Sequence, residues 1–145
     1  MKKNIQTLII LMSIAFSLNL LAEKKQISRQ SNTVKQKVSQ LVKQTIDDIK
    51  KIKKVDDRVA INQKLIQSIR EARLSVGLQT PEDEFYLDML VDTLKAIPVA
   101  SNFKLESCGE YKSEILRLFD PKSEGKTEHP PVNQGLEVLK NICAK

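Results

Sequence analysis

The chain is poor in the residues that build β-structure and tight turns. It has no tryptophan, two tyrosines, four phenylalanines and only four glycines in 145 residues. Small β-sandwiches need frequent turns and aromatic core residues, whereas the helix formers Leu, Ile, Lys, Glu and Gln are plentiful here. The composition therefore predicts an all-α protein, a small bundle of about four to five helices.

The chain also lacks motifs that mark nucleotide-binding proteins, hydrolases and zinc sites. None of its glycines lies in a GxGxxG, GxxxxGK or GxSxG pattern. Its single histidine, His129, stands before two prolines, and no CxxC or HxxxH pair is present to hold zinc. We therefore expect no enzyme activity, no catalytic or metal-binding residues and no cofactor. An exported enzyme or thiol-redox protein is the less favoured alternative.

The first 22 residues have the layout of a bacterial secretory signal peptide. Two lysines precede an apolar run over 8–21, and small residues follow before charge resumes at Glu23. Polar residues interrupt the run, which is shorter than the ~20 apolar residues of a membrane span, so an uncleaved anchor is the weaker alternative. Cleavage after Ala22, or after Ser17 as a second candidate, predicts an exported protein, periplasmic or secreted, with no transmembrane span once 1–22 is removed.

The remaining 123 residues, 23–145, suit a single helical domain. Its first part, 24–75, is a long basic amphipathic segment without glycine or proline, in which apolar residues recur at spacings of three and four. A second apolar stripe widens this face beyond the seam of a two-stranded coiled coil, through Val42, Ile46, Ile49, Ile61 and Leu65. The pattern indicates helix packed in a bundle.

Two arrangements of 24–75 fit this pattern. The favoured one is a helical hairpin turning near 53–57, because the lysines from Lys50 to Lys54 suit a helix C-terminus and Asp56 or Asp57 suits a new N-terminus. The other is one continuous helix of about 50 residues, ~75 Å long, which would need a partner chain to cover it. Self-association through 24–75 is therefore an open alternative.

Sharper signals delimit the helices that follow. Thr80 at the N-cap and Pro81 at the first helical position predict a helix over 81–97. A capping box of Ser107 and Glu110 predicts that a helix starts there and ends near Phe119. Residues 120–133 are rich in proline and charge, so we expect an exposed loop, and a last helix from about residue 134. The two last helices should form a hairpin over 107–144.

The two cysteines are expected to form a disulfide, since an even cysteine count in an exported chain favours one. Cys108 and Cys143 lie at nearly equal distances from the loop at Gly125, so an antiparallel hairpin would bring them side by side. Closing this loop of about 36 residues would contribute about 4 kcal/mol to stability. The competing interpretations are a reactive Cys108 thiolate, which would need His129 as its base, and a metal ligand.

Charge divides the chain into unlike halves. Residues 23–74 hold 14 Lys or Arg against 6 Asp or Glu, a net charge of +8, whereas residues 75–145 hold 8 against 12, a net charge of −4. A possible surface for an anionic partner consists of Lys50, Lys51, Lys53, Lys54 and Arg58. The plainer interpretation is that these lysines line a solvated face. Nucleic acid is not an expected partner, because residues 23–74 contain no aromatic side chain for base stacking.

Together these observations predict an exported, non-enzymatic helical protein that binds another macromolecule. The partner is expected to be a protein, in an inhibitor or immunity-like, adaptor or chaperone role, and the sequence does not distinguish these roles. The alternative is a peripheral protein that binds an anionic envelope surface or polymer through the basic N-terminal helices.

Overall fold

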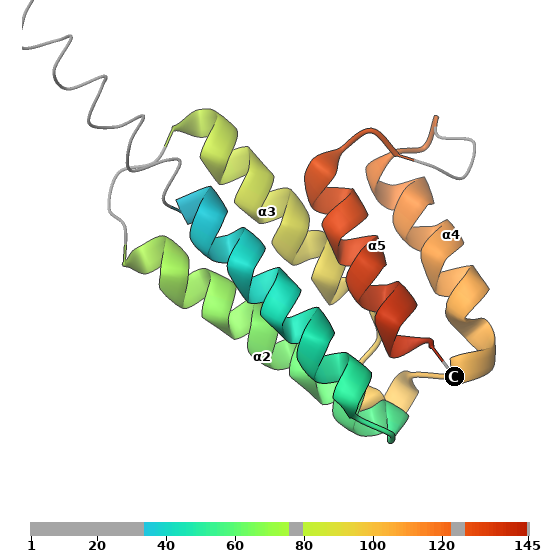
Figure 1. Ribbon diagram of the computed structural model, residues 1–145. Coiled ribbons are helices and arrows are strands. Elements are labelled where there is room, and N and C mark those ends of the chain that lie inside the picture. The colour runs from blue at the N-terminus through green and yellow to red at the C-terminus, as the bar shows by residue number, and fades with distance from the viewer. Residues whose placement is uncertain (1–33, 76–79, 123–126, 145) are drawn as a thin grey trace, which may run out of the picture.

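The computed structural model describes residues 34–75, 80–122 and 127–144. Within them the chain forms five α-helices and no strand: a first helix over 34–51, α2 (Val55–Leu74), α3 (Pro81–Lys95), α4 (Cys108–Phe119) and α5 (Pro130–Ile142). Successive helices run in alternating directions (Figure 1). The predicted all-α bundle is confirmed. The predicted signal peptide, 1–22, lies outside the described residues.

The basic segment folds as a hairpin rather than as one long helix. The first helix ends at residue 51, and α2 begins at Val55 after an extended N-cap residue, Lys54 (φ −80°, ψ 129°). Asp56 and Asp57 occupy the first turn of α2, where carboxylates complement the positive end of the helix. The turn therefore lies at 52–54, at the early edge of the predicted position, and both arms fold back on the same chain.

The core lies where the hairpin packs against α3 and α5. The fully buried side chains include Val34, Val38 and Ile49 of the first helix, Val59 and Ile69 of α2, Leu87, Leu90 and Leu94 of α3, and Val132, Val138 and Ile142 of α5. By contrast, α4 buries only Ile115 and Leu116, so it lies on the edge of the bundle. Contacts other than the burial of apolar side chains must therefore keep α4 attached to the bundle.

The start of α3 matches the sequence signal closely. The Thr80 hydroxyl accepts a hydrogen bond from the Asp83 backbone N–H (3.2 Å), and the Asp83 carboxylate accepts one from the Thr80 N–H (3.4 Å), which completes a capping box. Pro81 occupies the first turn, where its missing N–H costs nothing. The helix ends at Lys95, two residues before the predicted end.

α4 begins at Cys108 with Ser107 as its N-cap residue, as predicted, but the predicted capping box is absent, and the predicted start of α5 is wrong. Ser107 makes no side-chain cap on α4, because it ends a 3₁₀ turn (Leu105–Ser107) and has φ −88° and ψ 10° instead of the extended backbone that capping requires. α5 starts at Pro130 rather than near residue 134, because Pro130 and Pro131 fit its first turn, as proline does at the start of any helix. The loop between α4 and α5 is thus shorter than the predicted loop over 120–133.

The closest approach of α3 and α5 depends on Gly135. A Cβ atom at this position would overlap the Cγ2 methyl of the buried Thr93 and lie 3.0 Å from its Cβ. Thr93 cannot easily turn aside, because its hydroxyl donates a hydrogen bond to the Met89 carbonyl (2.7 Å). Gly135 is therefore needed for packing.

We predict that Gly135→Ala lowers the free energy of unfolding by about 1–3 kcal/mol, because the added methyl overpacks the α3–α5 contact. Urea titration followed by circular dichroism would measure the change. Gly109→Ala is the matched control: open space surrounds that position, so the free energy should stay equal or rise by up to about 1 kcal/mol. Thr93→Ser should recover part of the loss in the Gly135→Ala background. Equal effects of the two alanine substitutions would contradict the explanation.

Candidate functional site

A groove runs along the outer side of the N-terminal hairpin, between the first helix and α2. Its volume is about 300 Å³, and it is lined by Leu41, Gln44, Thr45 and Asp48 from the first helix and by Ile61, Lys64, Leu65 and Ser68 from α2. The lining residues span 41–48 on one helix and 61–68 on the other, about 10 Å or two turns along each. We call this feature the hairpin groove.

The hairpin groove has an apolar floor and polar walls. Leu65 is buried, and Leu41 and Ile61 are half-buried, so aliphatic surface lies at the bottom. Among the wall residues, the Asp48 carboxylate is paired with Lys51 (3.0 Å), whereas Lys64 makes no hydrogen bond or ion pair with any described residue. The groove can therefore accept an apolar side chain at its floor and a carboxylate or carbonyl at its wall.

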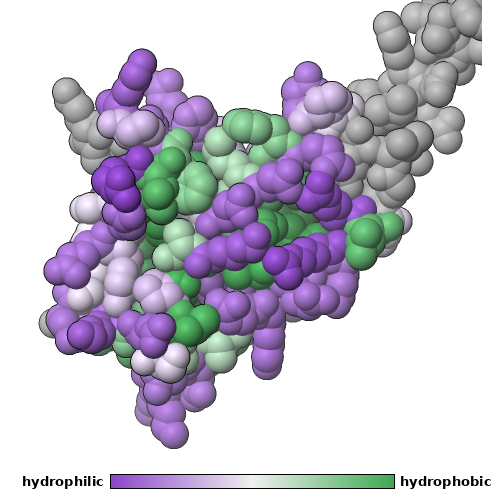
Figure 2. Space-filling model, turned by 180° about the vertical axis from the view of Figure 1, so that it is seen from behind, coloured by the Kyte–Doolittle hydropathy of each residue, from purple (hydrophilic) through white to green (hydrophobic). Residues whose placement is uncertain are grey.

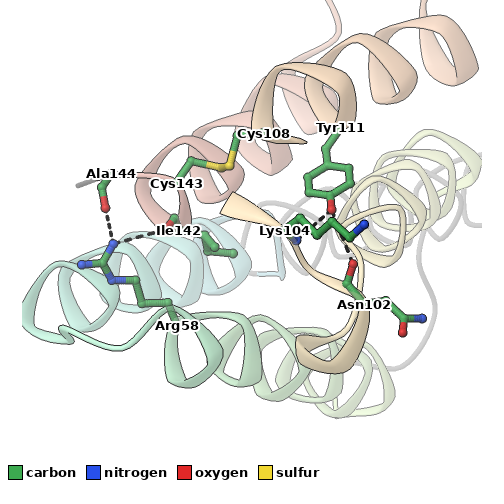
Figure 3. The surroundings of a disulfide bond; sticks show 8 residues. All are labelled: Arg58, Asn102, Lys104, Cys108, Tyr111, Ile142, Cys143 and Ala144. Atoms are coloured by element: carbon green, nitrogen blue, oxygen red, sulfur yellow. Dashed lines mark hydrogen bonds between the residues drawn. A yellow bond between two sulfur atoms is a disulfide. The ribbon is translucent and has the colours of Figure 1, made fainter. Parts of the chain in front are cut away.

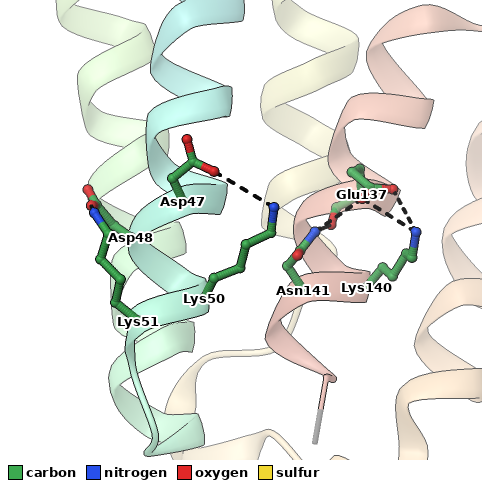
Figure 4. A network of polar contacts seen from close by, with 7 residues as sticks. All are labelled: Asp47, Asp48, Lys50, Lys51, Glu137, Lys140 and Asn141. Carbon is green, nitrogen blue, oxygen red and sulfur yellow. Dashed lines mark hydrogen bonds and ion pairs between the residues drawn. The ribbon is translucent and has the colours of Figure 1, made fainter.

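The predicted basic surface lies at the turn of the hairpin, and its charge is largely compensated. Lys50 pairs with Asp47 (3.7 Å) and Lys51 with Asp48 (3.0 Å), each one helical turn back along the first helix (Figure 4). Residues 47–58 contain five Lys or Arg and four Asp or Glu, a net charge of only +1. Lys53 and Lys54 are exposed, and their ammonium groups make no polar contact with described residues.

Arg58 points inward to the end of α5 instead of joining the lysines. Its guanidinium donates hydrogen bonds to the Ile142 carbonyl (3.2 Å) and the Ala144 carbonyl (Figure 3). It also donates one to the Ile52 carbonyl (2.6 Å). A cation at the C-terminal end of a helix satisfies carbonyls that lack helical partners. Arg58 is therefore a structural contact, and the proposed anion-binding surface reduces to the four lysines.

The predicted disulfide is confirmed. Cys108, at the start of α4, is bonded to Cys143, just after α5, with 6.2 Å between their Cα atoms (Figure 3). The described residues contain no free cysteine, so neither thiol is available as a nucleophile or a metal ligand. The start of α4 is held on its other side by Tyr111, whose ring packs on Phe103 (5.2 Å between centroids) and whose hydroxyl accepts a hydrogen bond from the Lys104 N–H (2.9 Å).

At the opposite end of the bundle, a polar chain joins three helices. Lys35 of the first helix contacts the fully buried Asp83 carboxylate (2.6 Å) and lies 5.8 Å from the centroid of the Tyr86 ring. The Tyr86 hydroxyl donates to Gln134 of α5 (2.7 Å). Burial raises the pKa of this hydroxyl above its usual value, although the hydrogen bond and the Lys35 charge act in the opposite direction. Two of the three consecutive acids at 82–84 thus have structural partners: Asp83 contacts Lys35, and Glu84 contacts Arg73.

The remaining sequence candidates do not assemble into a site. His129 is an exposed residue at the N-cap of α5, and its backbone N–H donates to the Thr127 hydroxyl (3.1 Å). Across 34–75, 80–122 and 127–144, no three His, Cys, Asp or Glu side chains are grouped so as to hold a metal ion. Nor does any helix in those ranges combine the length and apolarity needed to cross a membrane.

Comparison with known proteins identified no relative of this chain. No family model matches the chain, and neither the curated proteins nor the solved structures include a significant match.

The sequence contains a signal for the hairpin groove, although helical spacing alone does not mark it as a site. Ile61 and Leu65 belong to the second apolar stripe, which indicated a wide buried face. Only the hairpin geometry shows that Ile61 and Leu41 are left half-exposed between the arms.

We predict that loss of the disulfide loosens α4 before the rest of the bundle, because α4 buries so few side chains. Replacing both cysteines, Cys108→Ser with Cys143→Ser, should lower the free energy of unfolding by about 4 kcal/mol or somewhat less. In hydrogen exchange, amides of α4 should lose more protection than those of α3, which serves as the internal control. Equal losses in both helices would show that α4 is not separately held.

Proposed function

We propose that this chain is an exported, non-enzymatic helical protein that works by binding a protein partner. The observation that carries the proposal is the hairpin groove, whose apolar floor and hydrogen-bonding walls suit a helix of the partner. Two turns of groove would accept two or three successive apolar side chains from one face of such a helix. The disulfide supports the exported location, because disulfides persist in oxidising compartments.

The role of such a protein would be to hold a partner rather than to transform a substrate. Inhibitor or immunity-like, adaptor and chaperone roles all use this kind of contact. The sequence, which carries no assembled catalytic motif, supports binding over turnover.

Filling the hairpin groove should abolish partner binding. Ser68 lies half-buried in the groove wall, so Ser68→Trp places a large ring over the floor. Gln63→Trp adds the same ring to an exposed position of α2 that does not line the groove, and it is the matched control. Affinity capture from an extract of the producing organism should recover a partner with the wild type and the control but not with Ser68→Trp.

The same experiment separates this function from the alternative, binding to an anionic envelope surface. That alternative rests on the four lysines at the turn, of which Lys53 and Lys54 carry the uncompensated charge. It predicts that capture is lost on Lys53→Ala with Lys54→Ala and at raised salt, while Ser68→Trp has no effect. Either that result or identical capture by all variants would contradict binding in the hairpin groove.

A further inference from the structure

An exposed aromatic side chain stands on the outer face of α3. Phe85 is 62% exposed, and it is the only exposed one of the five aromatic residues in the described part of the chain. α3 lies behind the first helix and α5 in Figure 1, and from behind the surface shows apolar side chains between bands of hydrophilic ones (Figure 2). An exposed phenylalanine costs free energy in water, and aromatic residues are enriched where proteins bind one another.

The residues around Phe85 give this face a negative charge. Glu82, Phe85, Asp88 and Asp92 follow each other at spacings of three and four, so they share one face of α3. Residues 81–92 contain five Asp or Glu and no Lys or Arg. The buried Asp83 is turned inward to Lys35 and does not contribute to this face.

Within the described part of the chain, two basic residues reach these acids. Arg73 of α2 contacts Glu84 and also Asp88 (2.6 Å), while Asp92 pairs with Lys95 (2.9 Å). The Glu82 carboxylate makes no polar contact with a described residue. Among the described residues, four carboxylates are thus met by two cations, which leaves a surplus of two negative charges beside the exposed ring. Met89 lies one turn after Phe85 and is half-buried, so it adds apolar surface beside the ring.

We propose that this strip, Glu82, Phe85, Asp88, Met89 and Asp92, is a docking surface for a basic, amphipathic segment of a protein partner. Phe85 would insert among apolar side chains of that segment as a buried anchor, and its Lys or Arg side chains would pair with the carboxylates on either side. The strip lies on a different element from the hairpin groove, so this inference does not rest on the proposed function of the groove.

Two synthetic peptides test the proposal on the full, oxidised chain. Both carry leucine and one tryptophan on the apolar face of a helix; the polar face is lysine and arginine in one and glutamate in the other. Because the chain has no tryptophan, peptide fluorescence reports binding without interference. The basic peptide should bind and the acidic one should not. Amide shifts in nuclear magnetic resonance spectra should be largest over 82–92.

Substitutions decide whether binding uses the strip. Phe85→Ala should weaken the basic peptide about tenfold, as the loss of an anchoring side chain does, and Glu82→Lys should weaken it severalfold. Leu118→Ala is the control, because it removes a comparably exposed apolar side chain (52%) from α4 and should change affinity less than about twofold. Circular dichroism checks that each variant is folded.

Three results would overturn the proposal. The first is no binding of the basic peptide, or equal binding of both peptides. The second is binding that Phe85→Ala leaves unchanged. The third is a Phe85-dependent dimer in sedimentation, because that would make a second copy of the chain, and not a basic partner, the occupant of this face.

Discussion

The last turn of α5 holds together parts of the molecule that are distant in sequence. On one side, Cys143 is bonded to Cys108 at the start of α4. On the other side, the carbonyls of Ile142 and Ala144 accept hydrogen bonds from Arg58, which also bonds the turn of the N-terminal hairpin through the Ile52 carbonyl. The charged donor completes a helix end whose carbonyls would otherwise lack protein partners, and the covalent bond fixes the edge helix.

This arrangement explains how a small chain keeps two of its surfaces uncovered by its own helices. Arg58 fixes the hairpin at its turn, and the contact of Lys35 with Asp83 fixes it at its open end. The two arms therefore stay in place without another helix packed over their outer side, where the hairpin groove lies. Because α4 and α5 cover the other side of the core, the outer face of α3 stays open and carries Phe85. A rigid scaffold of this kind lowers the ordering cost of binding a partner.

Local signals predicted much of the fold. The all-α class, the start of α3 and the pairing of Cys108 with Cys143 followed from composition, Thr80 with Pro81, and the symmetry of an antiparallel hairpin. Ser107 failed as a cap because the preceding residues form a 3₁₀ turn, which no sequence spacing indicates. The predicted loop over 120–133 is wrong at Pro130 and Pro131, because proline also fits a first helical turn.

The site depended on contacts that sequence spacing does not reveal. In the sequence Arg58 lies close to the lysines, yet its partners Ile142 and Ala144 lie more than 80 residues away along the chain. The hairpin groove and the exposure of Phe85 arise from which helix faces remain uncovered, and that is a property of the whole bundle. Apolar residues that pack into the core and apolar residues that remain exposed look alike in the sequence.

A double-mutant cycle between Arg58 and the disulfide tests most directly whether the last turn of α5 joins the two parts. The free energy of unfolding would be measured for the wild type, for Arg58→Met, for the chain with both cysteines replaced by serine, and for the combination. If the disulfide orders the carbonyls that Arg58 binds, Arg58→Met should cost about 1 kcal/mol less in the serine background than in the wild type. Effects that add within about 0.5 kcal/mol would contradict this account.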